Sequence, residues 1–170
     1  TDVDSHRSLP ILPFSRERLD SLELYPFKSM IEQDVAMVMI GHLFIPSLDT
    51  IVSTLSHKVV TKLLKEEMKF DGIVVTDALN MKGARGDMPI GETDVQALIA
   101  GNDILLFPEN VEKAITAIKR AVSEGRITES QIDKHVEKVF SLKRIIFGEE
   151  GFCADSLISD STELYRAMHT

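Results

Sequence analysis

The order of segments along the chain predicts an α/β protein built on a parallel sheet. Three short apolar runs alternate with longer stretches that have helical periodicity; the runs are Val35–Ile40, Ile73–Thr76 and Ile104–Phe107. Strands that are apolar on both faces suit a sheet covered by helices on both sides. Alternation of strand and helix along a chain is typical of parallel strands joined by right-handed crossovers.

The composition is that of an ordinary folded domain and argues against several classes of function. Of the 170 residues, 44% are hydrophobic and 27% charged, which suffices for one domain with a sizeable core. The net charge of −8 disfavours a nucleic-acid surface, which needs a basic patch, and no apolar run approaches the ~20 residues of a membrane span. Cys153 is the only cysteine, the histidines lack metal-ligand spacing and no phosphate-binding glycine motif occurs. We therefore expect neither a metal nor a cofactor.

Periodicity and capping residues predict the helices. The predicted helices are 15–33 with a break near Pro26, 56–69 with Ser56 as N-cap, 94–100, 111–124, and 128–146 opened by a capping box and ended by Gly148. Three glycines and a proline within Met81–Thr93 predict a long loop. We assign residues 1–148 to one domain and residues 149–170, where the pattern is lost, to a linker or tail.

Asp77 is the first candidate site residue, because it ends the buried run Ile73–Thr76. Ligands bind at the carboxyl ends of parallel strands, but Asp also favours caps and turns. Position alone supports the two interpretations equally. His42 occupies the same place after Val35–Ile40; it can line a pocket, although a hydrogen-bonded structural histidine is the favoured interpretation.

A second candidate is the triplet Asp4-Ser5-His6 on irregular backbone near the start of the chain. A carboxylate beside an imidazole can fix its tautomer and raise its pKa, which makes the pair suited to proton transfer near neutral pH. Taken by itself, the triplet is better interpreted as a solvated loop.

The stretch from Phe70 to Gly83, Phe-Asp-Gly-Ile-Val-Val-Thr-Asp-Ala-Leu-Asn-Met-Lys-Gly, resembles the nucleophile segment of glycoside hydrolase family 3, in the branch of bacterial β-N-acetylglucosaminidases. The resemblance covers roughly residues 1–147. It implies that the chain is the C-terminal part, about strands six to eight, of a TIM-type (β/α)8 barrel. It also implies that Asp77 is the nucleophile, His6 the general acid/base and Asp4 its partner, with His42 and Met81 as candidate substrate contacts.

The implied function is retaining hydrolysis of terminal β-linked N-acetylglucosamine in cell-wall or chitin-type fragments, as in bacterial peptidoglycan recycling. Three alternatives stay open: a non-catalytic scaffold or binding fragment, a family-3 β-glucosidase, and a phosphorylase. The Asp4-Ser5-His6 triplet disfavours the β-glucosidase, because those members take their acid/base from a Glu outside this region. A Lys-His-Phe-Pro-Gly-His-Gly-like stretch before Thr1 would favour the enzyme.

The beginning of the chain has neither an initiator Met nor a signal peptide, so we expect it to start inside a larger protein. Localisation, cytoplasmic or periplasmic in a bacterium, is left open. Family members hold the sugar with residues that would precede Thr1. We therefore expect the missing N-terminal half of the barrel, or self-association, to cover exposed sheet edges and helix faces.

Overall fold

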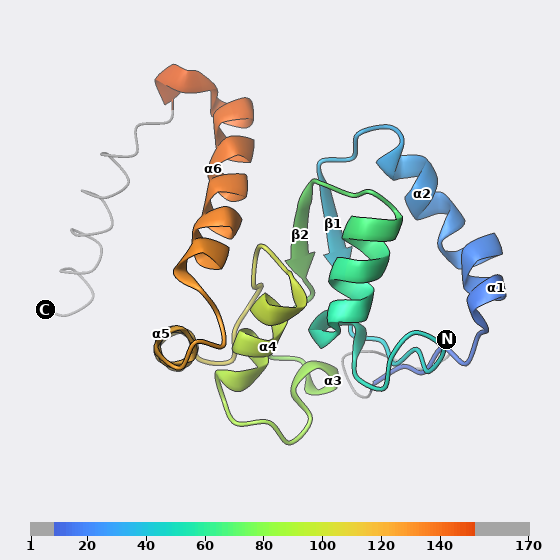
Figure 1. The fold of residues 1–170 in the computed structure, drawn as a ribbon, viewed down its shortest axis with the longest axis horizontal. Helices are drawn as coiled ribbons and strands as arrows, with labels where there is room; N and C mark the ends of the chain where they lie inside the picture. Colours follow the sequence, from blue (N-terminus) through green and yellow to red (C-terminus); the bar gives the residue numbers. More distant parts are fainter. Residues whose placement is uncertain (1–8, 152–170) are drawn as a thin grey trace, which may run out of the picture.

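A small parallel sheet lies at the centre of the structure, with helices packed around it (Figure 1). The computed structural model describes residues 9–151, apart from the side chains of residue 85 and residues 147–151. Its elements are α1 (Arg16–Arg18), η1 (Leu19–Glu23), α2 (Tyr25–Ile31), β1 (Met37–Ile40), η2 (Ser53–Leu55), η3 (Lys58–Glu67), β2 (Ile73–Thr76), α3 (Lys82–Arg85), α4 (Glu92–Ala100), α5 (Val111–Ser123) and α6 (Glu129–Gly151). The α/β class and the parallel sheet predicted from the sequence are confirmed.

Strand β2 lies between the other two apolar runs, as predicted. It pairs in parallel with β1, in a register that matches Met37 with Ile73 and Ile40 with Thr76. On its other side, Val75 forms a parallel bridge with Ile104, and the Thr76 amide donates to the Ile104 carbonyl at 3.0 Å.

The prediction that Ile104–Phe107 forms a third buried strand is wrong beyond Ile104. The Leu106 amide donates to the Thr76 side-chain hydroxyl at 2.9 Å rather than to a strand carbonyl. The Leu106 carbonyl accepts from Leu79, past the end of β2. This segment therefore curls around the end of β2, and Phe107 is 67% exposed with a φ of 45°.

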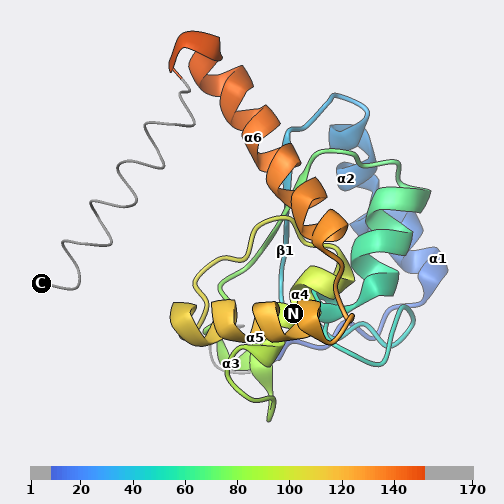
Figure 2. The same cartoon turned by 60° about the vertical axis from the view of Figure 1, so that its left-hand side comes forward.

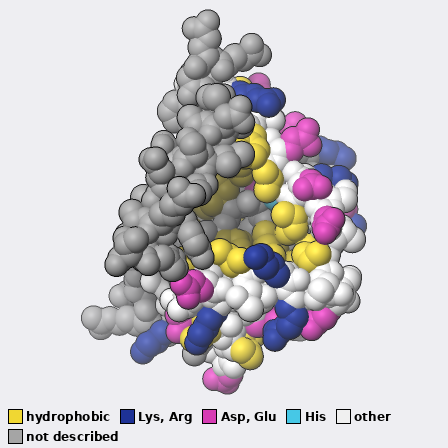
Figure 3. All heavy atoms as spheres, turned by 90° about the vertical axis from the view of Figure 1, so that its left-hand side faces the viewer, with side chains coloured by type: hydrophobic (Ala, Val, Ile, Leu, Met, Phe, Trp, Pro, Cys, Tyr) yellow, Lys and Arg dark blue, Asp and Glu magenta, His cyan; other side chains and the backbone are white. Residues whose placement is uncertain are grey.

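One face of β1 packs into the main core and the other does not. Val38 and Ile40 join side chains from η3, β2, the loop between them and the end of α4 in one cluster: Val60, Leu64, Phe70, Val74 and Ala100. Met37 and Met39, which alternate with them, are 40% and 52% exposed, as the period of a strand requires. Seen from the side of α6, hydrophobic side chains gather beside a hollow in the middle of the molecule (Figure 3).

Most predicted helix boundaries are confirmed. Pro26 lies in the first turn of α2, and the segment before it is broken into short pieces. Ser56 accepts a hydrogen bond from the Val59 amide at 3.2 Å. The capping box is also present, because the Thr128 amide donates to Gln131 Oε1 at 2.8 Å while the Gln131 amide donates to Thr128 Oγ1 at 3.2 Å.

Two helix predictions need correction. The stretch Met81–Thr93 is not all loop, since it contains α3 and the start of α4; α3 includes Gly83, and its Ala84 is buried in a cluster with Leu79 and Ala97. Helix α6 continues past Gly148 to Gly151, so the prediction that this helix ends at Gly148 is wrong. A single glycine costs only about 1 kcal/mol within a helix. Figure 2 shows α5 and α6 running in different directions along one side of the molecule.

Candidate active site

Asp77 lies at the carboxyl end of β2, where the polypeptide leaves the sheet. Its amide donates to the Ile40 carbonyl at 3.0 Å, so the backbone pairing with β1 continues to this residue. The side chain is half-buried, and its Oδ1 accepts a hydrogen bond from the Ala78 amide at 2.7 Å. A carboxylate held in this way at the edge of a parallel sheet is placed where α/β proteins bind ligands.

His42 lies at the end of β1 beside Asp77, with only 1% of its surface exposed. Its Nε2 is 3.0 Å from the Ala78 carbonyl oxygen, and its Nδ1 is 2.7 Å from Thr54 Oγ1. A carbonyl oxygen only accepts hydrogen bonds, so Nε2 carries the proton. Burial lowers the pKa of His42, while the Ala78 carbonyl and the Asp77 charge oppose that fall. The imidazole is therefore neutral near pH 7.

Two further buried side chains support this arrangement. Thr54 is fully buried in η2. The fully buried Asn102 donates through Nδ2 to the Thr54 carbonyl at 2.9 Å and to the Ala97 carbonyl at 2.7 Å. Asn102 thus ties η2 to the end of α4. Sequence reasoning missed both residues, because no local pattern marks them.

The remaining candidates have different outcomes. The Met81 side chain is 8% exposed, and its amide donates to the Ala78 carbonyl at 3.1 Å. His42 and Met81 therefore converge on the Ala78 carbonyl, and both side chains are buried within the described part of the chain. Asp4 and His6 lie outside the described residues. The nearest described residue, Leu9, lies against Gly83: a β-carbon at residue 83 would be 3.6 Å from Leu9 Cα and 3.7 Å from His42 Cβ.

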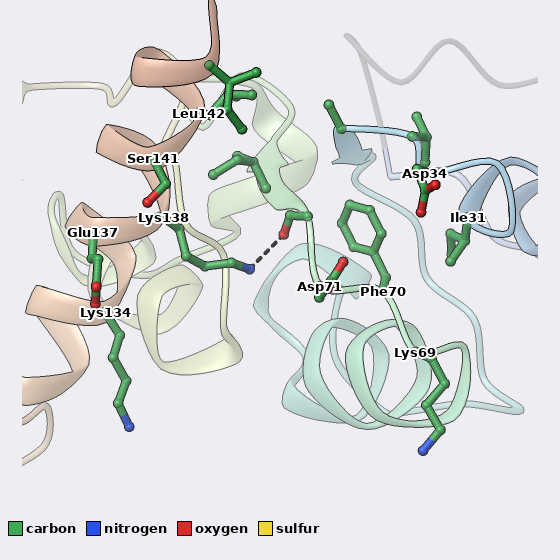
Figure 4. Close-up of a pocket in the computed structure, with 15 residues that line it drawn as sticks. Ile31, Asp34, Lys69, Phe70, Asp71, Lys134, Glu137, Lys138, Ser141 and Leu142 are labelled. Atoms are coloured by element: carbon green, nitrogen blue, oxygen red, sulfur yellow. Dashed lines mark hydrogen bonds between the residues drawn. The ribbon is translucent and has the colours of Figure 1, made fainter. Parts of the chain in front are cut away.

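At the opposite end of the strands, an open groove of about 900 Å3 separates α6 from the starts of β1 and β2. Figure 4 shows Lys138 reaching from α6 to the Gly72 carbonyl, a 2.7 Å hydrogen bond, with Phe70 and Asp71 across the groove. In a β/α barrel, residues at this end of the strands usually contribute to stability rather than to chemistry.

A buried carboxylate next to this groove joins α6 to the sheet. Asp103 accepts from His135 Nδ1 at 2.7 Å, from the Val74 amide at 2.8 Å and from Lys65 Nζ at 3.3 Å. Burial acts to raise the pKa of Asp103, but the hydrogen bonds from His135 and Val74 and the charges of Lys65 and Lys138 outweigh it and lower that pKa to about 2.

Neither a metal cluster nor a membrane helix is found in the described part of the chain. Residues 9–151 contain no group of three or more His, Cys, Asp or Glu side chains arranged to hold a metal ion. None of the described helices is both long and apolar enough to cross a membrane.

These features define a class, that of parallel α/β proteins with a candidate carboxylate site at the carboxyl edge of the sheet. Residues 1–142 match the model of the glycosyl hydrolase family 3 N-terminal domain, and the chain belongs to this family. The family resemblance recognised from the Asp77 segment is therefore confirmed.

Similar proteins include several glycosidases. A β-hexosaminidase A of Pseudoalteromonas piscicida is 27% identical over 165 residues, which cover 84% of this chain and 28% of that protein. A β-hexosaminidase of Nitrosospira multiformis is 31% identical over 113 residues, 66% of this chain and 32% of that protein. Among solved structures, the family 3 β-N-acetylglucosaminidase of Paenibacillus sp. str. FPU-7 is 41% identical with a TM-score of 0.79, over 84% of this chain and 28% of that one. The chain thus spans about a third or less of these relatives.

Proposed function

We propose that the full-length protein is a retaining glycosidase that removes terminal β-linked N-acetylglucosamine, with Asp77 as its nucleophile. The observation that carries the proposal is the half-buried Asp77 carboxylate, oriented by the Ala78 amide at the carboxyl edge of the sheet. Relatives named β-hexosaminidase and β-N-acetylglucosaminidase support the substrate class. Peptidoglycan or chitin-type fragments are the substrates that this class suggests.

The proposed reaction has two steps. In the first, Asp77 attacks the anomeric carbon, the bond from that carbon to the leaving oxygen breaks, and His6 gives its proton to that oxygen. In the second, neutral His6 takes a proton from water, the water oxygen bonds to the anomeric carbon, and the ester to Asp77 breaks. Asp4 would orient His6 throughout. Two displacements retain the configuration of the sugar.

The position of Leu9 supports a role for His6. Leu9 packs in a cluster with Leu79 and Ala84, both in the segment that follows Asp77. His6 lies three positions before Leu9 in the sequence, with only Arg7 and Ser8 between them. This neighbourhood in sequence supports the proposal that His6 acts together with Asp77.

The exposed face of β1 supports the view that this chain is the later part of a barrel. We propose that β1, β2 and the run that begins at Ile104 correspond to about strands six to eight. The preceding units would cover Met37 and Met39 and would supply groups that hold the sugar. Residues 149–170 would follow the barrel as a linker or tail.

The test is covalent labelling of the full-length protein with a slow fluorinated N-acetylglucosaminide. We expect the label on the peptide that contains Asp77, and we expect the Asp77→Ala variant to lose both labelling and turnover. Asp71→Asn is the matched control, because Asp71 is an exposed carboxylate at the opposite end of β2. Labelling of another carboxylate, or none in the unaltered protein, would refute the proposal.

The leaving group distinguishes the role of His6 from that of Asp77. His6→Ala should slow substrates with poor leaving groups by ~10²–10⁴-fold, the usual contribution of general acid/base assistance, and should spare the first step with activated aryl glycosides. Equal slowing of both substrate types would argue against His6 as the acid. Comparing the products formed in water with those formed in phosphate buffer identifies the molecule that accepts the sugar, and so distinguishes hydrolysis from phosphorolysis.

A further inference from the structure

We propose that His42 is a positioning residue for Asp77, which acts through Ala78 and is itself held by Thr54. The inference deepens the proposed function and rests on it, because positioning matters only if the Asp77 carboxylate reacts. Neither His42 nor Thr54 would touch the sugar in this proposal.

Ala78 is fixed on both of its sides. Its amide donates to Asp77 Oδ1 at 2.7 Å, and its carbonyl accepts from His42 Nε2 at 3.0 Å and from the Met81 amide at 3.1 Å. The carbonyl bonds restrict rotation about the Ala78 backbone, and so they restrict the direction in which the Ala78 amide points. The Asp77 carboxylate takes its orientation from that amide.

The hydrogen bonds run in one direction from Thr54 to Ala78. Thr54 has a single hydroxyl proton and three nearby acceptors: His42 Nδ1 at 2.7 Å, the Gly41 carbonyl at 3.2 Å and the Ile40 carbonyl at 3.4 Å. The Gly41 carbonyl already accepts from Ser53 Oγ at 2.6 Å, and the Ile40 carbonyl already accepts from the Asp77 amide.

The Thr54 proton therefore goes to the nearest acceptor, Nδ1 of His42. This bond selects the tautomer of His42 that has its proton on Nε2, and only that neutral tautomer both accepts from Thr54 and donates to Ala78. Thr54 and His42 are 0% and 1% exposed. Such buried bonds are stronger than they would be in water.

The start of this chain of bonds is itself anchored. Asn102 holds the Thr54 carbonyl and, through Ala97, the last turns of α4. A displacement of about 1 Å at a reacting group can cost ~100-fold in rate. A continuous series of hydrogen bonds thus runs from α4 to the nucleophile, where a small displacement has the largest effect on the rate.

The test compares variants of the full-length protein that differ by one hydroxyl. Thr54→Val removes the hydroxyl and keeps the shape, and Thr54→Ser restores the hydroxyl. Thr61→Val is the matched control: it makes the same substitution and removes the 2.7 Å hydrogen bond from Thr61 Oγ1 to the Ala100 carbonyl, and Thr61 lies in η3, outside the hydrogen bonds that link Thr54, His42 and Ala78.

We expect Thr54→Val to lower kcat and the labelling rate of Asp77 by about 5- to 10-fold, the loss of one buried hydrogen bond, with KM nearly unchanged. Thr54→Ser should recover the rate. His42→Leu should lose about 100-fold, and His42→Gln, which keeps an N–H donor, should recover part of that loss. Thr61→Val should keep kcat even if it melts at a lower temperature.

Two results would overturn the inference. One is an equal loss of kcat in Thr54→Val and Thr61→Val, which would show a structural role only; the other is unchanged labelling in His42→Leu. If the unaltered protein is not labelled at all, the proposed function fails, and a nitrogen-15 spectrum of the His42 ring decides the positioning. The proton must lie on Nε2 in the unaltered protein and in Thr54→Ser, and the Nδ1 resonance must move to that of an acceptor without a hydrogen bond in Thr54→Val; a proton on Nδ1 of the unaltered protein refutes the inference.

Discussion

Loss of the Asp103 negative charge should weaken the attachment of α6 to the sheet. The carboxylate is 1% exposed and accepts from His135 on α6 and from the Val74 amide on β2. Burial lowers the pKa of Lys65, and the Asp103 charge opposes that fall. The lowered pKa of Lys65 does not remove the preference for a charged Asp103, because the hydrogen bonds that Asp103 accepts from His135 and Val74 do not depend on Lys65.

The expected magnitude follows from the pKa of Asp103, which the folded state lowers from 3.8 to about 2. At roughly 1.4 kcal/mol per pKa unit, this corresponds to about 2 kcal/mol of folding free energy. Because the folded-state pKa is the lower one, this stabilisation is present above pH ~4 and is lost as the pH falls through about 2. Asp103→Asn at pH 7 should cost more, about 3–5 kcal/mol, since Lys65 and Lys138 then lose a buried partner.

The assay is urea unfolding of the full-length protein and of Asp103→Asn at several values between pH 2 and 7, followed by circular dichroism. Hydrogen exchange of the α6 peptides reports the local effect. The matched control is Glu66→Gln, which breaks an ion pair with Lys62 whose two side chains are 51% and 55% exposed. The free energy of unfolding of that variant should fall by no more than about 0.5 kcal/mol.

Two outcomes would refute this reasoning about Asp103. The first is a difference in the free energy of unfolding between Asp103→Asn and the unaltered protein that stays constant from pH 5 to pH 2. The second is a loss in Asp103→Asn no larger than that in Glu66→Gln.

Two other predictions concern packing and assembly. Gly91→Ala and Gly125→Ala both place a side chain at positive φ, which costs roughly 1–2 kcal/mol. Gly91→Ala should lose about 1–3 kcal/mol more through overpacking, because its new β-carbon would lie 2.8 Å from the Lys113 carbonyl oxygen, whereas nothing lies within 4 Å of the one at residue 125; equal melting temperatures for the two variants would contradict this. The 170-residue chain alone should associate or melt at low temperature, because Met37 and Met39 leave one face of β1 uncovered; a monomer with a sharp cooperative melt in dilute solution, observed by light scattering and calorimetry, would be evidence against it.

Local features of the sequence determined the elements of this fold and the place of its candidate nucleophile. The apolar runs before His42 and Asp77 predict buried strands, which is confirmed for β2 but for only one face of β1. The capping box at Thr128 predicts the start of α6. Each of these depends on residues within a few positions of one another, so periodicity, propensity and capping suffice to find them. The position of Asp77 at a strand end is a consequence of the same pattern.

Only the tertiary structure decided which side chains surround Asp77 and how they are held. His42 meets Ala78 across 36 positions of sequence, and Asn102 meets Thr54 across 48. These contacts depend on the parallel register of β1 with β2 and on the place where α4 ends. The departure of the run after Ile104 from the sheet has the same origin, because a hydroxyl of β2 replaces a backbone partner there. Local sequence does not encode such pairings, since their free energy comes from burial and hydrogen bonds that form only when distant segments meet.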